Sequence, residues 1–236
     1  MPERFEFQDL SEAVFWGVDL QRATFRDVDL MGARVSHARV VDVVIDAEID
    51  RLVVNGVDVT GYVNERDGWF ALRSQLHPTE PQAMRRGWQA FATAWASAID
   101  RARGMPEVQR YASVDGEWSF VHTLRHLVFA IDKWFTVPIL GAAFHPIGLP
   151  NSGSADFGWP GLDDVADPSF DDAVAAWRDR TERLHDYLGG VRALSLSVEV
   201  PVLENGANAV HDCLGVVFEE HFQHLRYALR DLDRLG

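Results

Sequence analysis

Large apolar residues recur at every fifth position near the start of the chain, within residues 6–48. The positions that share this phase are Leu10, Phe15, Leu20, Phe25, Leu30, Val35, Val40 and Ile45. Two places before them, from the second onward, stand the small or β-branched residues Ala13, Val18, Ala23, Val28, Ala33, Ala38 and Val43. Residues that recur at every fifth position do not stay on one face of an α-helix or of a β-strand. An amphipathic helix and a flat strand are therefore both excluded. The pattern therefore predicts an internal repeat.

This repeat resembles the pentapeptide-repeat family, whose fold is a four-sided, right-handed β-helix. The resemblance implies that the large residues stack inside the coil with the small ones beside them. The eight repeats, at four per coil, make about two coils, fewer than the roughly three units that independent stability usually needs. We therefore expect the segment to dock on the rest of the chain and to be a structural appendage, with a binding platform as the alternative.

After residue 48 the five-residue phase is lost, and Leu52–Val59 predicts two short strands joined by an Asn55-Gly56 turn. Apolar residues at helical spacing begin only further along the chain, after these predicted strands. These changes of pattern predict two domains, a repeat segment at residues 1–62 and a helical domain at residues 63–236.

Four segments of the second domain have apolar residues at helical spacing. Their limits, read from caps and helix breakers, are Thr79 to Gly104, a start at Ser119 after an Asp115-Gly116 turn, Ser169 to Gly189-Gly190, and about 207 to 235. A strand-like stretch, Leu194–Val202, and an Asn205-Gly206 turn precede the last helix. The predicted fold class is mainly α: a four-helix bundle preceded by a short right-handed quadrilateral β-helix.

The candidate chemistry lies on the last helix, where Glu220 and His224 are four residues apart. Residues at this spacing lie on one helix face with Cβ atoms roughly 6 Å apart, so both can bind one ion. His221 stands beside Glu220 and offers a further donor. The candidate third ligand is His126, on the helix that begins at Ser119. A His, Glu, His set with one open position is typical of a catalytic zinc site.

Plainer interpretations stay open for these residues. An i,i+4 pair of Glu and His is more often a surface contact than a metal site. However, Glu220 and His224 lie at the margin of an apolar stripe, where an unpaired carboxylate is rare. That stripe comprises Val210, Leu214, Val217, His221, Leu225, Ala228 and Leu232. Because His221 is at its centre, it is a ligand, a residue that supports a ligand, or a hydrogen-bonded core histidine.

A loop rich in Pro, Gly and Asp is expected at residues 137–168. A segment of this length without secondary structure is uncommon in a compact domain unless it has a task such as covering a site. Its aromatic residues are Phe144, Phe157 and Trp159. We expect the loop to cover the metal region and His145 to reach it.

Charge and cysteine content narrow the classes of function. The net charge of −14 opposes nonspecific binding to nucleic acid or to anionic membranes. The single cysteine, Cys213, permits no intramolecular disulfide, and no apolar run reaches about 18 residues. The acidic start does not resemble a signal peptide. We expect a cytoplasmic protein with a small-molecule substrate as its partner, and leave open a homodimer.

The helical domain resembles the DinB-like superfamily, which includes the mycothiol-dependent maleylpyruvate isomerases. The matching stretches are Gly116–Phe120, Thr123–Leu127, Phe144–Pro146, Gly148–Pro150 and Glu220–Leu232. The resemblance implies a metal held by one histidine of the second helix and an i,i+4 pair of the fourth, which fall on His126, Glu220 and His224. Many members carry histidine at both positions of the pair, whereas the isomerase branch has Glu at the first, as here.

The sequence supports two functions from different classes. The first is a metal-dependent enzyme in which zinc, or alternatively nickel, activates a thiol or water for transfer, isomerisation or hydrolysis of a small molecule. A thiol cofactor such as mycothiol is implied by the resemblance alone, and the sequence specifies no catalytic residue. The second is a non-catalytic interaction module stapled by the metal. A closed site with four protein ligands favours the module, and a retained water favours the enzyme.

Overall fold

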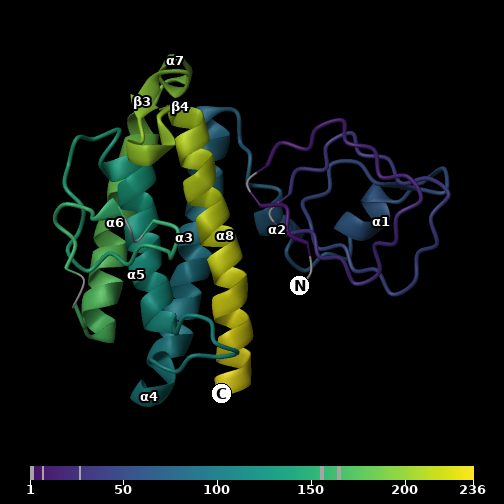
Figure 1. Cartoon of the computed structure of the whole chain (residues 1–236). Helices are drawn as coiled ribbons and strands as arrows, with labels where there is room; N and C mark the ends of the chain where they lie inside the picture. Colours follow the sequence, from purple (N-terminus) through teal and green to yellow (C-terminus); the bar gives the residue numbers. More distant parts are fainter. Residues whose placement is uncertain (1–2, 7, 27, 155–156, 164–165) are drawn as a thin grey trace. The chain divides into compact units, whose positions relative to one another are not determined.

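The computed structural model describes residues 3–6, 8–26, 28–154, 157–163 and 166–236 (Figure 1). The chain forms two compact units, Met1–Asp46 and Ala47–Gly236. The domain boundary predicted after residue 62 stays a prediction, because a division of the chain into compact units does not by itself define where a domain ends. The predicted loop at 137–168 includes residues 155–156 and 164–165, which lie outside the described part of the chain.

The five-residue period of the first unit is visible in its backbone. Among the described residues of this unit, positive φ angles lie at Glu12, Gly17, Arg22, Gly32, His37 and Asp42. At every tenth residue the carboxylates of Asp9, Asp19 and Asp29 accept a hydrogen bond from the backbone N–H two residues later, at 2.8–2.9 Å. Such Asp side chains mimic a backbone turn. The repeat is therefore a repeat of turns, and the chain winds in coils (Figure 1).

The expectation that the large repeat residues pack inside the coil is wrong. From Leu10 to Ile45 these side chains are 44–82% exposed. The described residues of this unit form turns without paired strands. The physical reason is the small number of coils, because about two layers give each large side chain a neighbour on one side only.

Residues 1–62, expressed alone, are expected to show no cooperative thermal transition. Burial of apolar surface is the main source of folding free energy, and the repeats leave their large side chains exposed. Far-UV circular dichroism during heating, with the full chain as the control, tests this. A sigmoidal melt close to that of the full chain would contradict the expectation.

The predicted hairpin is confirmed at the start of the second unit. Strands β1 (Val53–Val54) and β2 (Val57–Asp58) pair in antiparallel fashion. Asn55 and Gly56 have φ angles of 50° and 82°, as the tightest two-residue hairpin turn requires. Two short helices come next, α1 (Thr60–Asn64) and α2 (Phe70–Arg73).

The predicted four-helix bundle is confirmed (Figure 1). Its helices are α3 (Pro81–Arg103), α5 (Phe120–Ile131), α6 (Phe170–Gly190) and α8 (Val210–Leu235), and α5 continues as a π-helix, η1 (Asp132–Thr136). The shorter elements are α4 (Glu107–Arg110), α7 (Ala193–Leu196), β3 (Glu199–Pro201), η3 (Leu203–Asn205) and β4 (Ala207–Ala209). None of the helices in the described ranges has the length and apolarity to cross a bilayer.

Two of the bundle helices, α5 and α6, begin at the predicted capping serines. The Ser119 hydroxyl accepts a hydrogen bond from the His122 N–H, and Ser169 forms a reciprocal capping box with Asp172. Pro81 occupies the first turn of α3, where its missing N–H costs nothing. These caps fix where the helices begin, and the apolar stripe of each helix decides which side chains face the bundle interior.

The segment before α8 differs from the prediction. Residues 193–196 form a helical turn, only Glu199–Pro201 is a strand, and residues 207–209 pair with it as β4. Gly206, with φ 73°, turns the chain back. Because the backbone N–H and C=O groups of β4 are engaged in this hairpin, α8 begins at Val210.

Candidate metal centre

The structure brings His126 of α5 together with Glu220 and His224 of α8. One potential ligand atom of each lies within 4.8 Å of the others. The Glu220 Oε2 atom is 3.2 Å from His126 Nε2 and 3.1 Å from His224 Nε2. The i,i+4 spacing on α8 puts the carboxylate and one imidazole on the same face, and α5 supplies the second imidazole. Two helices thus bring three potential metal ligands together.

A backbone carbonyl orients the His126 ring. His126 Nδ1 lies 3.1 Å from the Leu149 carbonyl oxygen, which accepts only a hydrogen bond, so we assign the proton to Nδ1. The loop is held there because the Leu149 N–H donates to the Arg125 carbonyl oxygen at 3.1 Å and Arg125 Nε donates to the Ile147 carbonyl oxygen at 2.9 Å. The other ring nitrogen, Nε2, therefore faces Glu220 with a lone pair that could bind a metal ion.

This arrangement fits a cation. With Nδ1 protonated in a neutral ring, His126 Nε2 presents a lone pair to a carboxylate oxygen 3.2 Å away. Two acceptors at that distance repel each other unless a proton or a metal ion lies between them. Two imidazoles and one carboxylate are also the donor types that zinc prefers. The residues present therefore suit the metal that the family resemblance implies.

Glu220 supplies the negative charge of the cluster. Burial by itself raises the pKa of the Glu220 carboxyl. When the His126 and His224 nitrogens that face the carboxylate carry protons, their hydrogen bonds and attraction outweigh burial and hold the pKa well below its usual range; a bound cation would take the place of these protons. Glu220 is therefore ionised at neutral pH, as a metal ligand must be.

His221 lies outside the cluster. Its side chain is fully buried, Nδ1 is 2.8 Å from the Val217 carbonyl oxygen, and its ring meets Trp88 of α3 edge-on at 4.7 Å between centroids. Burial lowers the pKa of His221 to about 4, so the ring is neutral at pH 7. These contacts are those of a hydrogen-bonded core histidine, one of the three options for His221. The one ring nitrogen without a partner, Nε2, faces the core.

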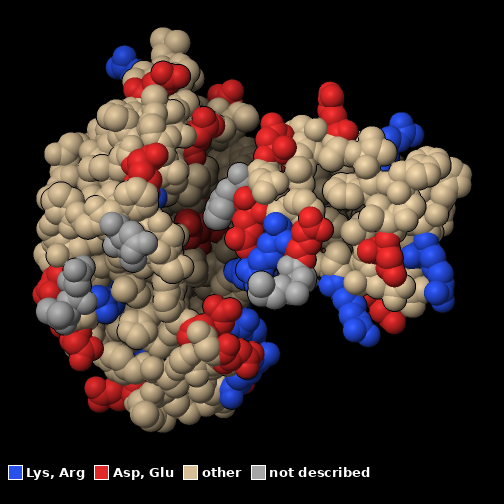
Figure 2. All heavy atoms as spheres, viewed as in Figure 1, with Lys and Arg blue, Asp and Glu red and all other residues tan. Residues whose placement is uncertain are grey.

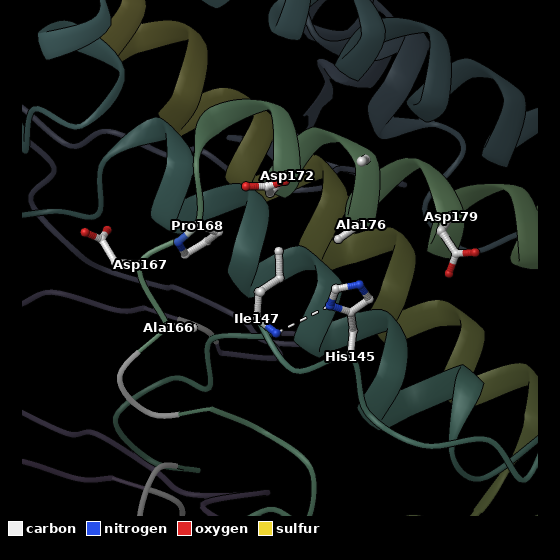
Figure 3. Close-up of a pocket in the computed structure, with 9 residues that line it drawn as sticks. His145, Ile147, Ala166, Asp167, Pro168, Asp172, Ala176 and Asp179 are labelled. Atoms are coloured by element: carbon white, nitrogen blue, oxygen red, sulfur yellow. Dashed lines mark hydrogen bonds between the residues drawn. The ribbon is translucent and has the colours of Figure 1, made fainter.

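The expectation that His145 reaches the metal region is wrong. His145 lies in a pocket of about 560 Å³ against α6, with Ile147, Pro168 and Ala176 (Figure 3). Burial and the nearby Arg180 lower the pKa of His145. Its backbone N–H donates to the Asp132 carboxylate at 2.6 Å, which draws this end of the loop toward α6. The loop approaches His126 through Leu149 instead, a backbone contact that no side-chain pattern could have predicted.

Cys213 is unsuited to nucleophilic catalysis. It is fully buried, and burial, with the adjacent Asp212, raises the pKa of its thiol to about 11. We expect the folded protein to resist iodoacetamide at pH 8, where the thiol stays protonated and inaccessible, and the urea-unfolded protein to be alkylated completely. Intact-mass measurement reads both states. Full labelling of the native protein at the rate of free cysteine would contradict this.

Comparison with known families supports the fold. A model described as DinB superfamily matches residues 90–228, more than half of the chain, so the chain belongs to the DinB superfamily. Pentapeptide repeats match residues 4–44 in eight copies. No match was found among curated proteins or among solved structures. His126, Glu220 and His224 all lie inside the DinB match.

Proposed function

We propose that the protein is a metal-dependent enzyme acting on a small molecule, with zinc as the preferred ion and nickel as the alternative. The observation that carries the proposal is the convergence of His126, Glu220 and His224 within 4.8 Å, with no fourth such ligand grouped with them among the described residues. Three protein ligands plus an open position are the pattern of catalytic rather than structural zinc.

The chemistry would come from the bound ion, which brings the pKa of a bound water to about 7 and deprotonates a coordinating thiol. The chain supplies the remaining elements. Glu220 offsets the charge of the cation, the Leu149 carbonyl holds the tautomer of His126, and the buried side of α5 excludes water behind it. Transfer, isomerisation and hydrolysis all fit this arrangement. A low-molecular-weight thiol such as mycothiol is proposed on family resemblance alone.

Metal analysis of protein purified without a histidine tag tests the proposal first. We expect close to one zinc or nickel ion per chain. Turnover should then be screened with low-molecular-weight thiols and electrophilic substrates, using metal-free protein as the control. A chain that binds no stoichiometric divalent metal after equilibration would refute the proposed function.

A non-catalytic, metal-stapled module is the second candidate. This candidate is favoured by the helices from which the ligands come. An ion bound by His126 of α5 and by two residues of α8 would cross-link the two helices. Cobalt substitution separates the candidates. An open site changes its visible spectrum when azide or a thiol is added, whereas a closed site with four protein ligands does not.

The charge of the protein bears on which partners it can bind. On the face shown in Figure 2, acidic and basic side chains are interspersed, and the sequence carries 36 acidic against 22 basic residues. This balance supports a small-molecule substrate over nucleic acid or an anionic membrane. A homodimer and a cytoplasmic location stay predictions from the sequence.

A further inference from the structure

Trp118 lies against both imidazoles of the candidate metal centre. The centroid of its indole is 4.5 Å from that of His126 and 5.9 Å from that of His224. The planes of Trp118 and His224 are 22° apart, a stacked arrangement. The two imidazoles are themselves 4.8 Å apart. One half-buried indole thus contacts ligands that come from two different helices.

The position of Trp118 is set by a tight turn before α5. Asp115 and Gly116 have φ angles of 54° and 80°, and the Glu117 N–H donates to the Val114 carbonyl oxygen at 2.9 Å. Arg234 of α8 forms an ion pair with Asp115. Immediately after the indole, Ser119 caps α5. The indole is therefore held between the start of the helix that carries His126 and the helix that carries the other two ligands.

We propose that Trp118 is a positioning residue of the metal centre, which fixes the planes of His126 and His224 and stabilises their metal-bound form. This inference rests on the proposed function. An imidazole that coordinates a divalent cation carries part of its positive charge, and the face of an indole attracts positive charge. The near-parallel Trp118 and His224 rings have the geometry for this attraction.

Trp118 also decides from which side the site is open. It covers the two imidazoles on one side, and the side chain of His126 is only 4% exposed. Glu220 is 27% exposed and is the most accessible of the three candidate ligands. An incoming water, thiol or substrate atom therefore reaches the metal from the Glu220 side. The indole excludes water from the sides of the two imidazoles that it covers, which strengthens electrostatic attraction at the site.

The test compares Trp118→Leu with Trp118→Phe in the full-length protein. Leucine keeps an apolar wall but has no aromatic face, whereas phenylalanine keeps the face. We expect Trp118→Leu to weaken zinc binding about 10-fold or more, in the range found for residues that support metal ligands. Trp118→Phe should restore most of the affinity. Competition with a chromophoric chelator measures zinc affinity, and the visible spectrum of the saturated cobalt form reports ligand geometry.

The matched control is Trp69→Leu, because Trp69 is also half-buried and packs on α8, at Phe222, away from the ligands. It should lower the melting temperature of the metal-free protein without changing zinc affinity or the cobalt spectrum. Zinc affinity and cobalt spectrum of Trp118→Leu equal to those of the wild type would overturn the inference while leaving the proposed function standing. Absence of zinc binding in the wild type would instead overturn the proposed function.

Discussion

Replacing His126 or His224 with alanine is expected to abolish stoichiometric zinc binding while the metal-free protein still folds. Each substitution leaves two of the three donors that converge at the site. Two ligands close no coordination triangle, whether they come from one helix or from two, and zinc sites in proteins use at least three protein ligands. Metal content after dialysis against buffered zinc, measured by mass spectrometry, gives the result, and circular dichroism confirms that the helices remain.

Glu220→Gln and His221→Ala decide the assignment of the ligands. Glu220→Gln keeps the size of the side chain but removes the charge that offsets the cation, so zinc occupancy should fall strongly. His221→Ala should keep zinc and lower the free energy of unfolding by about 2–5 kcal/mol, as loss of a large buried side chain does. The assignment fails if zinc survives Glu220→Gln and is lost in His221→Ala.

Much of the helical domain could be predicted because its signals are local. A cap such as Ser119 or Ser169 acts within one helical turn. The i,i+4 spacing of Glu220 and His224 places both side chains on the same helix face, whatever the rest of the fold. His126 is different, because its nearness to α8 depends on how the helices pack. The sequence offered His126 as the candidate third ligand and the family resemblance fell on the same residue, but local spacing could not show that the two helices meet there.

The features that the sequence did not reveal depend on contacts between distant segments. The Leu149 carbonyl that orients His126 has no side-chain signature. Trp118 stands in a stretch that matches the family, but its contact with both imidazoles depends on the turn at Asp115 and on the packing of α5 against α8. In the repeats, the five-residue period correctly predicted an internal repeat, which the backbone shows as a repeat of turns. It could not predict side-chain burial, which depends on the number of stacked layers.

A buried ion pair joins the end of the second bundle helix to the third. Asp132 is fully buried at the start of η1, and Arg180 of α6 donates from Nε to its Oδ1 at 2.6 Å. The other carboxylate oxygen accepts the His145 N–H at 2.6 Å. Arg180 also contacts Asp179, whose side chain is 44% exposed. Asp132 therefore joins α5, α6 and the loop that contains His145.

Asp132→Ala is expected to lower the free energy of unfolding by about 3–5 kcal/mol, the range for breaking a buried ion pair from one side. The substitution leaves the buried Arg180 with the partly exposed Asp179 as its remaining carboxylate, beside the Ala143 carbonyl oxygen, and leaves the His145 N–H without its acceptor. Urea unfolding followed by tryptophan fluorescence measures the change. Asp179→Ala is the matched control, since it removes the other carboxylate on Arg180 and, being near the surface, should cost roughly 1 kcal/mol or less. Equal losses for the two variants would mean that the buried carboxylate has no special weight, and that apolar packing alone holds α5 and α6 together.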